Sequence, residues 1–140
     1  MNGVNATSKP SVYGALTAAL WFGAAGLFAF SVAPSAFDVL PAGLAGTLVG
    51  RVLPPILVVG MIIGFGIAIV DISYRRWAGV VMGVACAIDR FGVVPRVGAP
   101  GTLAFGRLHA VSVVLYSIAA IAALVVVIAA WRSYGTQYSR

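Results

Sequence analysis

The sequence predicts an all-α protein, an integral membrane four-helix bundle built as a single domain over residues 1–140. Of these residues, 61% are hydrophobic and only 9% are charged, whereas soluble domains carry roughly 25% charged residues. So few ionic groups cannot cover a soluble globule, and we expect lipid to surround most of the chain. Four apolar runs, each near the roughly 20 residues that a membrane-crossing helix needs, supply the helices.

The first run illustrates how the ends of the spans are assigned. The four expected spans are, in chain order, about 12–33, 52–70, 77–95 and 108–131. The first contains no charged residue, and we expect Ala33-Pro34 to end it, because proline has no N–H to donate. A cleaved signal peptide is the alternative, but the run exceeds the roughly 7–15 residues of a signal h-region. A connection of about 18 residues, 33–50, would then lead to the second span.

The second and third runs each leave an alternative open. The second ends before Asp71, and Pro54-Pro55 lies near its start, where missing N–H groups cost least. An earlier start near Pro41 would make one long helix kinked at the prolines. The third run is interrupted by Asp89-Arg90, and we interpret it as one span with this pair inside, a re-entrant segment being the alternative. The fourth run carries no charge apart from His109 at its start.

The distribution of basic residues predicts the orientation. Four spans put both chain ends on one side of the membrane, where five basic residues flank the spans: Lys9, Arg75, Arg76, Arg132 and Arg140. The other side has three basic residues, Arg51, Arg96 and Arg107. Arg90, just inside the membrane, would make four. Because short cytoplasmic flanks carry an excess of Lys and Arg, the counts predict that both ends are cytoplasmic.

Glycines recur at helical spacing among the 17 in the chain. Gly60 and Gly64 are four apart in the second span, and Gly79 and Gly83 are four apart in the third. Small residues at this GxxxG spacing let helix backbones approach closely in lipid. We expect them to pack helices within the chain, with a dimer interface as the alternative.

A polar cluster is expected at the end of the bundle opposite the termini. At 1.5 Å per residue, Asp89 lies roughly 18 Å from the cytoplasmic boundary, past the middle of a core about 30 Å thick. A charge in hydrocarbon needs a partner. Helix neighbours one apart point about 100° away from each other, so Arg51 or Arg107 is a better partner for Asp89 than Arg90. The side chains expected at this end are Asp38, Arg51, Asp89, Arg90, Arg107 and His109.

Three interpretations of Asp89 stay open. It forms a buried ion pair that locks two helices, or it belongs to a small polar cavity that binds an ion, a proton or a polar ligand, or it snorkels to the outer interface. The cluster therefore predicts either a ligand site or a structural pair, and the residue types alone do not separate them.

The residue inventory argues against most other chemistry. The chain has no glutamate and one histidine, and Cys86 is its single cysteine. A haem or copper centre normally needs two or more good ligands. No nucleophile–base motif or phosphate-binding glycine loop occurs, so we expect no enzyme activity, no metal and no cofactor. The basic residues are scattered, which argues against nucleic acid. The expected partners are membrane lipids and other membrane proteins in a homo- or hetero-oligomer.

Several short motifs resemble a known family. They are Ala33-Pro34-Ser35-Ala36-Phe37, Leu40-Pro41, Ala45-Gly46, Val49-Gly50-Arg51, Val94-Pro95-Arg96, Phe105 and Arg107-Leu108-His109. In this order they resemble a bacterial four-helix membrane family that is similar to the vertebrate transmembrane protein 205. The resemblance implies a multi-pass domain of a bacterial cytoplasmic membrane and no established activity. The positions it singles out are Pro34, Phe37, Pro41, Gly46, Gly50, Arg51, Pro95, Arg96, Arg107 and His109.

These observations lead to one functional expectation and two rivals. We expect a non-enzymatic membrane domain with a structural, accessory or small-ligand-binding role. The first rival is a small transporter or channel component that uses Asp89 as an intramembrane cation or proton site. The second is a haem- or copper-handling membrane protein that acts through His109.

Overall fold

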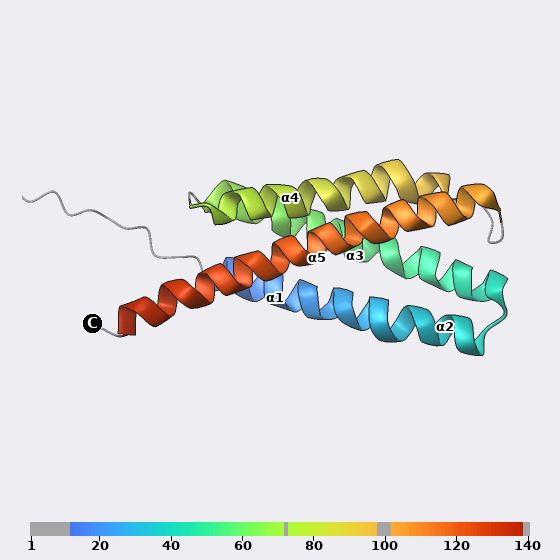
Figure 1. Cartoon of the computed structure of the whole chain (residues 1–140), viewed down its shortest axis with the longest axis horizontal. Coiled ribbons are helices and arrows are strands. Elements are labelled where there is room, and N and C mark those ends of the chain that lie inside the picture. The colour runs from blue at the N-terminus through green and yellow to red at the C-terminus, as the bar shows by residue number, and fades with distance from the viewer. Residues whose placement is uncertain (1–11, 72, 98–101, 139–140) are drawn as a thin grey trace, which may run out of the picture.

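Four long helical rods lie side by side in the protein (Figure 1). The computed structural model describes residues 12–71, 73–97 and 102–138. Each rod is long and apolar enough to cross a membrane, and the four are Val12–Val39, Ala42–Val70, Arg75–Arg96 and Leu103–Ser133. The predicted all-α fold is therefore confirmed, and the chain is a multi-pass membrane protein.

Two of the rods contain a π-helical segment. In chain order the elements are α1 (Val12–Leu27), the π-helical η1 (Phe28–Val32), α2 (Ala33–Val39), α3 (Ala42–Val70), α4 (Arg75–Ala87), the π-helical η2 (Ile88–Val93), the 3₁₀ turn η3 (Val94–Arg96) and α5 (Leu103–Tyr138).

Each π-helical segment lies just before a proline. The N–H of Ala33 donates to the carbonyl of Phe28, five residues back, and Pro34 follows. In the third rod the N–H of Val94 donates to the carbonyl of Asp89, and Pro95 follows. A proline has no N–H, and its ring crowds the preceding turn of an α-helix. The wider π turn shifts the hydrogen-bond register before the proline. The first rod then continues to Val39, whereas the third ends at Arg96.

Three of the predicted boundaries are corrected by this arrangement. The prediction that the first span ends at Ala33-Pro34 is wrong, because helical structure continues to Val39. The expected connection over residues 33–50 is also wrong, since only two residues separate α2 from α3. For the second span the earlier start is correct: α3 begins at Ala42 and contains Pro54-Pro55.

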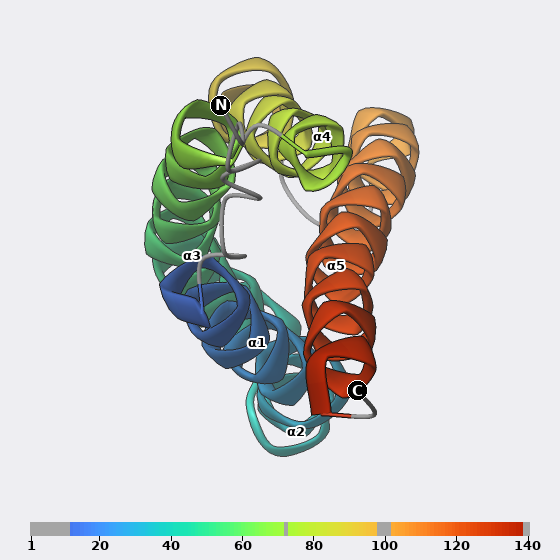
Figure 2. The same ribbon diagram turned by 90° about the vertical axis from the view of Figure 1, so that its left-hand side faces the viewer.

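The rods form a ring when the bundle is viewed along its length, in the order α1, α3, α4 and α5 (Figure 2). The start of α1, the turn between α3 and α4, and the end of α5 lie at one end, which we call the terminal end (Figure 1). The turn between α2 and α3 and the start of α5 lie at the other end, the distal end.

The core contains one tryptophan surrounded mainly by small and aliphatic side chains. The indole Nε1–H of Trp21 donates to the carbonyl of Ile56 at 2.8 Å, which joins α1 to α3. The hydroxyl of Tyr116 donates to the carbonyl of Ala25 at 3.0 Å, which joins α5 to α1. On the outer face the apolar side chains are exposed, Phe30 by 88%. Helices that are apolar on every side suit a bundle surrounded by lipid.

Glycines bring α3 and α4 into backbone contact. A Cβ atom added to Gly64 would lie 2.5 Å from the backbone N of Gly83 and 2.8 Å from the carbonyl O of Gly79. A Cβ atom on Gly79 would lie 2.7 Å from the carbonyl O of Gly64. At Gly60 it would meet the Trp21 ring. The faces of these glycines therefore pack against other helices of the same chain. Gly64 and Gly79 determine how closely the third rod approaches the second.

Candidate functional site

Asp89 is a carboxylate buried in the interior of the bundle. It is 0% exposed, and it lies in η2, after the apolar run of α4. Its Oδ2 accepts a hydrogen bond of 3.0 Å from the hydroxyl of Ser112 on α5. Its Oδ1 is also buried and has no hydrogen-bond partner among the described residues. One oxygen of the carboxylate is therefore held by the protein, and the other is left for another donor or a cation.

The arginines expected to pair with Asp89 do not reach it. Arg51 and Arg107 are exposed on the outer surface of α3 and α5. Among the described residues, no salt bridge joins Asp89 to any arginine. The prediction of a pair with Arg51 or Arg107 is therefore wrong. Hydropathy locates a residue along a helix, but the rotation of the helix about its own axis decides what its side chain meets.

Arg90, the sequence neighbour of Asp89, points elsewhere. Its guanidinium carbon lies 5.3 Å from the centroid of the Phe91 ring, within the range of a cation–π contact. Its Nε atom is buried without a hydrogen-bond partner among the described residues. The side chain is half-buried. As the helical geometry predicts, Arg90 makes no pair with Asp89.

A cavity of about 330 Å³ lies in the distal half of the bundle, and its lining includes Ser112, the partner of Asp89, but not Asp89 itself. One wall is the start of α3, where Gly43, Gly46 and Gly50 present bare backbone. A Cβ atom on Gly43 or Gly50 would meet no atom within 4 Å. The facing wall is formed by η3, by the residue that follows it and by α5, and it includes Ser112. Ser112 therefore connects the cavity with Asp89. The lining residues are Gly43, Gly46, Thr47, Val49, Gly50, Leu53, Val94, Val97, His109 and Ser112.

His109 is the residue of the predicted polar cluster that lines this cavity. It is exposed, and its imidazole stacks on the Phe105 ring with 5.5 Å between centroids and 4° between planes. Asp38 lies exposed in α2 and does not line the cavity. Of the six predicted cluster residues, the structure therefore gathers two around Ser112. One is His109, which lines the cavity itself, and the other is Asp89, which Ser112 holds.

A second polar group, at the terminal end, was not part of the predicted cluster. Asp71 forms a salt bridge of 2.7 Å with Arg75, and its Oδ1 accepts bonds from the N–H and hydroxyl of Ser73 at 2.9 and 2.6 Å. The hydroxyl of Ser73 accepts a bond of 3.1 Å from Nε of Arg75. This network closes the turn between α3 and α4. Its signal in the sequence is an aspartate, a serine two residues on and an arginine four residues on, directly after an apolar run.

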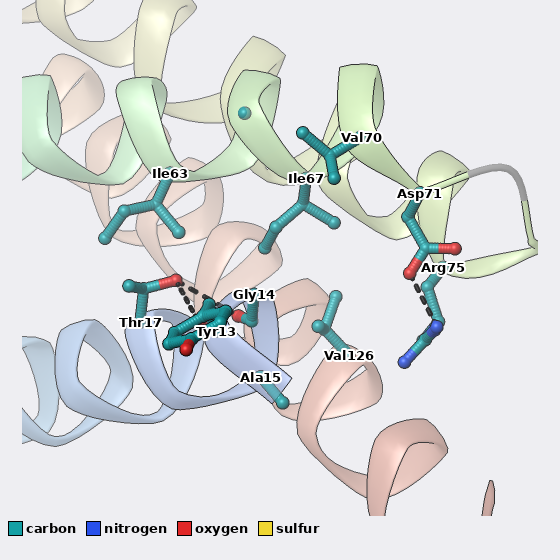
Figure 3. Close-up of a pocket in the computed structure, with 11 residues that line it drawn as sticks. Tyr13, Gly14, Ala15, Thr17, Ile63, Ile67, Val70, Asp71, Arg75 and Val126 are labelled. Carbon is teal, nitrogen blue, oxygen red and sulfur yellow. Dashed lines mark hydrogen bonds and ion pairs between the residues drawn. The ribbon is translucent and has the colours of Figure 1, made fainter. Parts of the chain in front are cut away.

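The Asp71–Arg75 pair borders an open apolar groove of about 420 Å³ (Figure 3). The groove runs between the start of α1, the last turns of α3 and the side of α5, and its lining comprises Tyr13, Gly14, Ala15, Thr17, Ile63, Gly66, Ile67, Val70, Asp71, Arg75 and Val126. Figure 3 shows the aliphatic side chains of α3 above the groove and the ion pair at its end.

In the part of the chain that the structure describes, no group of three or more His, Cys, Asp or Glu side chains gathers around a common point. Cys86 is buried, next to Gly60 and Trp21 in the core.

Comparison with known proteins adds the family of the chain. No curated protein and no solved structure matches it. A family model matches residues 16–99. This region is more than half of the 140 residues, and it includes the Asp71–Arg75 turn and Asp89 but not Ser112. The chain therefore belongs to the family described as a domain of unknown function, DUF4149.

Proposed function

We propose that this membrane protein is a non-enzymatic binding domain for a small monovalent cation, with Asp89 as the charged ligand in the distal half of the bundle. The single observation that carries the proposal is the buried Asp89 carboxylate, which has one oxygen held by Ser112 and the other without a partner among the described residues.

The energetics favour neutralisation of this carboxylate, by a proton or by a bound cation. An ionised side chain in the membrane interior costs several kcal/mol unless it is paired or hydrated. A single hydrogen bond from Ser112 offsets only about 1.5–3 kcal/mol of such a cost. A cation at Oδ1 would neutralise the charge, while the Ser112 hydroxyl stays bound to Oδ2.

Hard cations prefer oxygen ligands, and Thr47 and Ser112 are hydroxyl-bearing residues of the cavity lining. Carboxylate, carbonyl and water oxygens suit such ions better than imidazole or thiolate. The bare backbone at Gly43, Gly46 and Gly50 leaves room for water in front of Ser112. No hydrogen bond joins Ser112 to His109 in the described part of the chain. The lining therefore supports binding in preference to nucleophilic catalysis.

The test is the thermal stability of the purified protein in detergent, in sodium, potassium or lithium chloride and in N-methylglucamine chloride, whose bulky organic cation cannot approach a single buried carboxylate oxygen as a small inorganic ion does. We expect one of the small cations to raise the melting temperature of the wild type. A ligand at about 100 times its Kd stabilises a protein by about 2.7 kcal/mol. The Asp89→Asn variant, which keeps an acceptor for Ser112, should fold and lose the effect.

Ser117→Ala is the matched control, because Ser117 on α5 is exposed and bonds only the Val113 carbonyl of its own helix. It should keep the full response to the cation. Equal melting temperatures of the wild type in all four salts would contradict the proposal, as would an undiminished response in Asp89→Asn.

Transport of the same cation is the second candidate. It is favoured by the position of the cavity, which reaches the first turn of α3 at the distal end. A cation-dependent flux into proteoliposomes that Asp89→Asn abolishes would distinguish transport from binding alone. The haem- or copper-handling rival rests on His109 alone, and a Soret band or bound copper in the purified protein would be needed to support it.

We also propose that the chain is related to transmembrane protein 205 and that it lies in a bacterial cytoplasmic membrane with both ends in the cytoplasm. The relation is supported by the prolines of the resembling motifs, since Pro34 and Pro95 each follow a π turn. The orientation is supported by the basic residues of the terminal end, where Arg75 and Arg76 begin α4. Lys9 and Arg140, which also entered the count, lie outside the described residues.

A further inference from the structure

We propose that the groove at the terminal end is a binding site for one anionic glycerophospholipid, with an acyl chain along its apolar floor and the phosphate beside Arg75 and Arg76. This site is separate from the distal cavity and involves none of the residues that line it.

The shape and lining of the groove suit an acyl chain. Its volume is about 420 Å³, and its walls come from three helices, with Ile63, Ile67 and Val126 among the aliphatic side chains (Figure 3). Gly66 leaves the floor open, since a Cβ atom there would meet nothing within 4 Å. All three helices belong to rods long and apolar enough to cross a membrane, so an acyl chain in the groove would lie at the level of the lipid hydrocarbon.

The depth of the groove places its polar end at the headgroup level. Tyr74, the residue before α4, and Trp77, in the first turn of α4, are 64% and 70% exposed. Exposed Tyr and Trp side chains mark the interface between hydrocarbon and water in membrane proteins. The Asp71–Arg75 pair, which closes the groove, lies in the same turn. A lipid in the groove would therefore extend from the headgroup level into the hydrocarbon, as the surrounding membrane lipids do.

The excess of basic residues at the terminal end favours one class of lipid headgroup. Arg75 is only 6% exposed. Its guanidinium is held in place by the salt bridge to Asp71 and by the bond to the Ser73 hydroxyl. Arg76 and Arg132 are exposed at the same end. Among the described residues here, three arginines face a single aspartate. The excess of positive charge matches an anionic phosphate headgroup better than a zwitterionic one.

The test compares lipid binding by native mass spectrometry of the purified protein, with dioleoylphosphatidylglycerol and dioleoylphosphatidylcholine as probes. We expect one phosphatidylglycerol to bind, with an affinity about fivefold above that of phosphatidylcholine, because one basic residue near the surface contributes about this factor. Arg76→Gln should reduce this preference. Gly66→Leu, which fills the groove, should lower phosphatidylglycerol binding about fivefold, since close packing drives association in lipid.

Gly23→Leu is the matched control, because Gly23 also has open space around its Cβ position but does not line the groove. It should bind both lipids as the wild type does. If Gly66→Leu fails to give a monodisperse protein, Ala15→Leu on α1 fills the same groove from the opposite wall. Equal binding of the two lipids, or unchanged binding by a folded groove-filling variant, would overturn the proposal. So would a groove-filling variant that changes only the oligomeric state, since the occupant would then be a second copy of the chain.

Discussion

Asp71 and Asp89 follow apolar runs of similar character, but the protein surrounds them differently. Asp71 receives bonds from the N–H and hydroxyl of Ser73 and a salt bridge from Arg75, so both its oxygens are satisfied. Among the described residues, Asp89 receives only the bond from Ser112. A carboxylate whose hydrogen bonds are complete stabilises a turn, whereas one with a buried free oxygen is costly and fits a site that an occupant completes.

Ser112→Ala tests the single bond that holds Asp89. The change leaves Oδ2 of the carboxylate without a donor, so we expect a loss of about 1–3 kcal/mol in the free energy of unfolding. Ser117→Ala removes a bond to its own helix at the surface and should change stability by less than about 0.5 kcal/mol. Unfolding followed by circular dichroism in detergent compares the two. Equal stability of the two variants would show that the Ser112 hydroxyl does not hold the carboxylate.

At the scale of the elements, prolines and glycines determine the hydrogen-bond register of the helices and how closely they pack. Pro34 and Pro95 follow π turns, and Pro54-Pro55 lie inside α3. The first rod continues past its proline to Val39, whereas the third rod ends at Arg96, directly after Pro95. The glycines of α3 and α4 bring two backbones together where any side chain would intervene. Polar backbone groups in lipid must be satisfied internally, and the first and third rods shift their hydrogen-bond register before Pro34 and Pro95, whereas α3 contains Pro54-Pro55 without a π-helical segment.

Gly64→Ala and Gly66→Ala separate a close contact from an open position within one helix. A methyl group at Gly64 would lie 2.5 Å from backbone of α4 that cannot rotate away, so the helices must separate, and overpacking of this kind costs about 1–3 kcal/mol. At Gly66 the methyl group meets nothing within 4 Å, and alanine should be neutral or up to about 1 kcal/mol stabilising, because it favours the helix. Unfolding in detergent measures both. A harmless Gly64→Ala would contradict the contact between α3 and α4.

At the scale of the whole molecule, the bundle has two chemically different ends. The terminal end carries the completed Asp71–Arg75 network and further arginines. The distal half contains the incompletely bonded Asp89 carboxylate and the cavity that Ser112 lines. In the orientation we propose, the terminal end faces the cytoplasm, where basic flanks are retained. The distal cavity then opens toward the other side of the membrane.

Reporter fusions test this orientation. A reporter active only outside the cytoplasm should be inactive when fused after the C-terminus, because the end of α5 lies at the terminal end. The same reporter fused after Leu40, in the turn between α2 and α3, should be active. The pair of fusions serves as its own control, and the reverse pattern of activity would invert the orientation.

The sequence by itself determined the number of rods and the fold class. A helix in lipid must bury its own backbone groups, so an apolar run of sufficient length is enough to identify it. It also predicted how far along the third rod Asp89 lies, since the rise per residue is constant. Only the tertiary structure decided which groups meet. Ser112, one hydroxyl among several, became the partner of Asp89, while Arg51 and Arg107 turned outward. These contacts depend on the rotation and register of each helix, which follow from glycine packing and from the π turns before the prolines and not from composition.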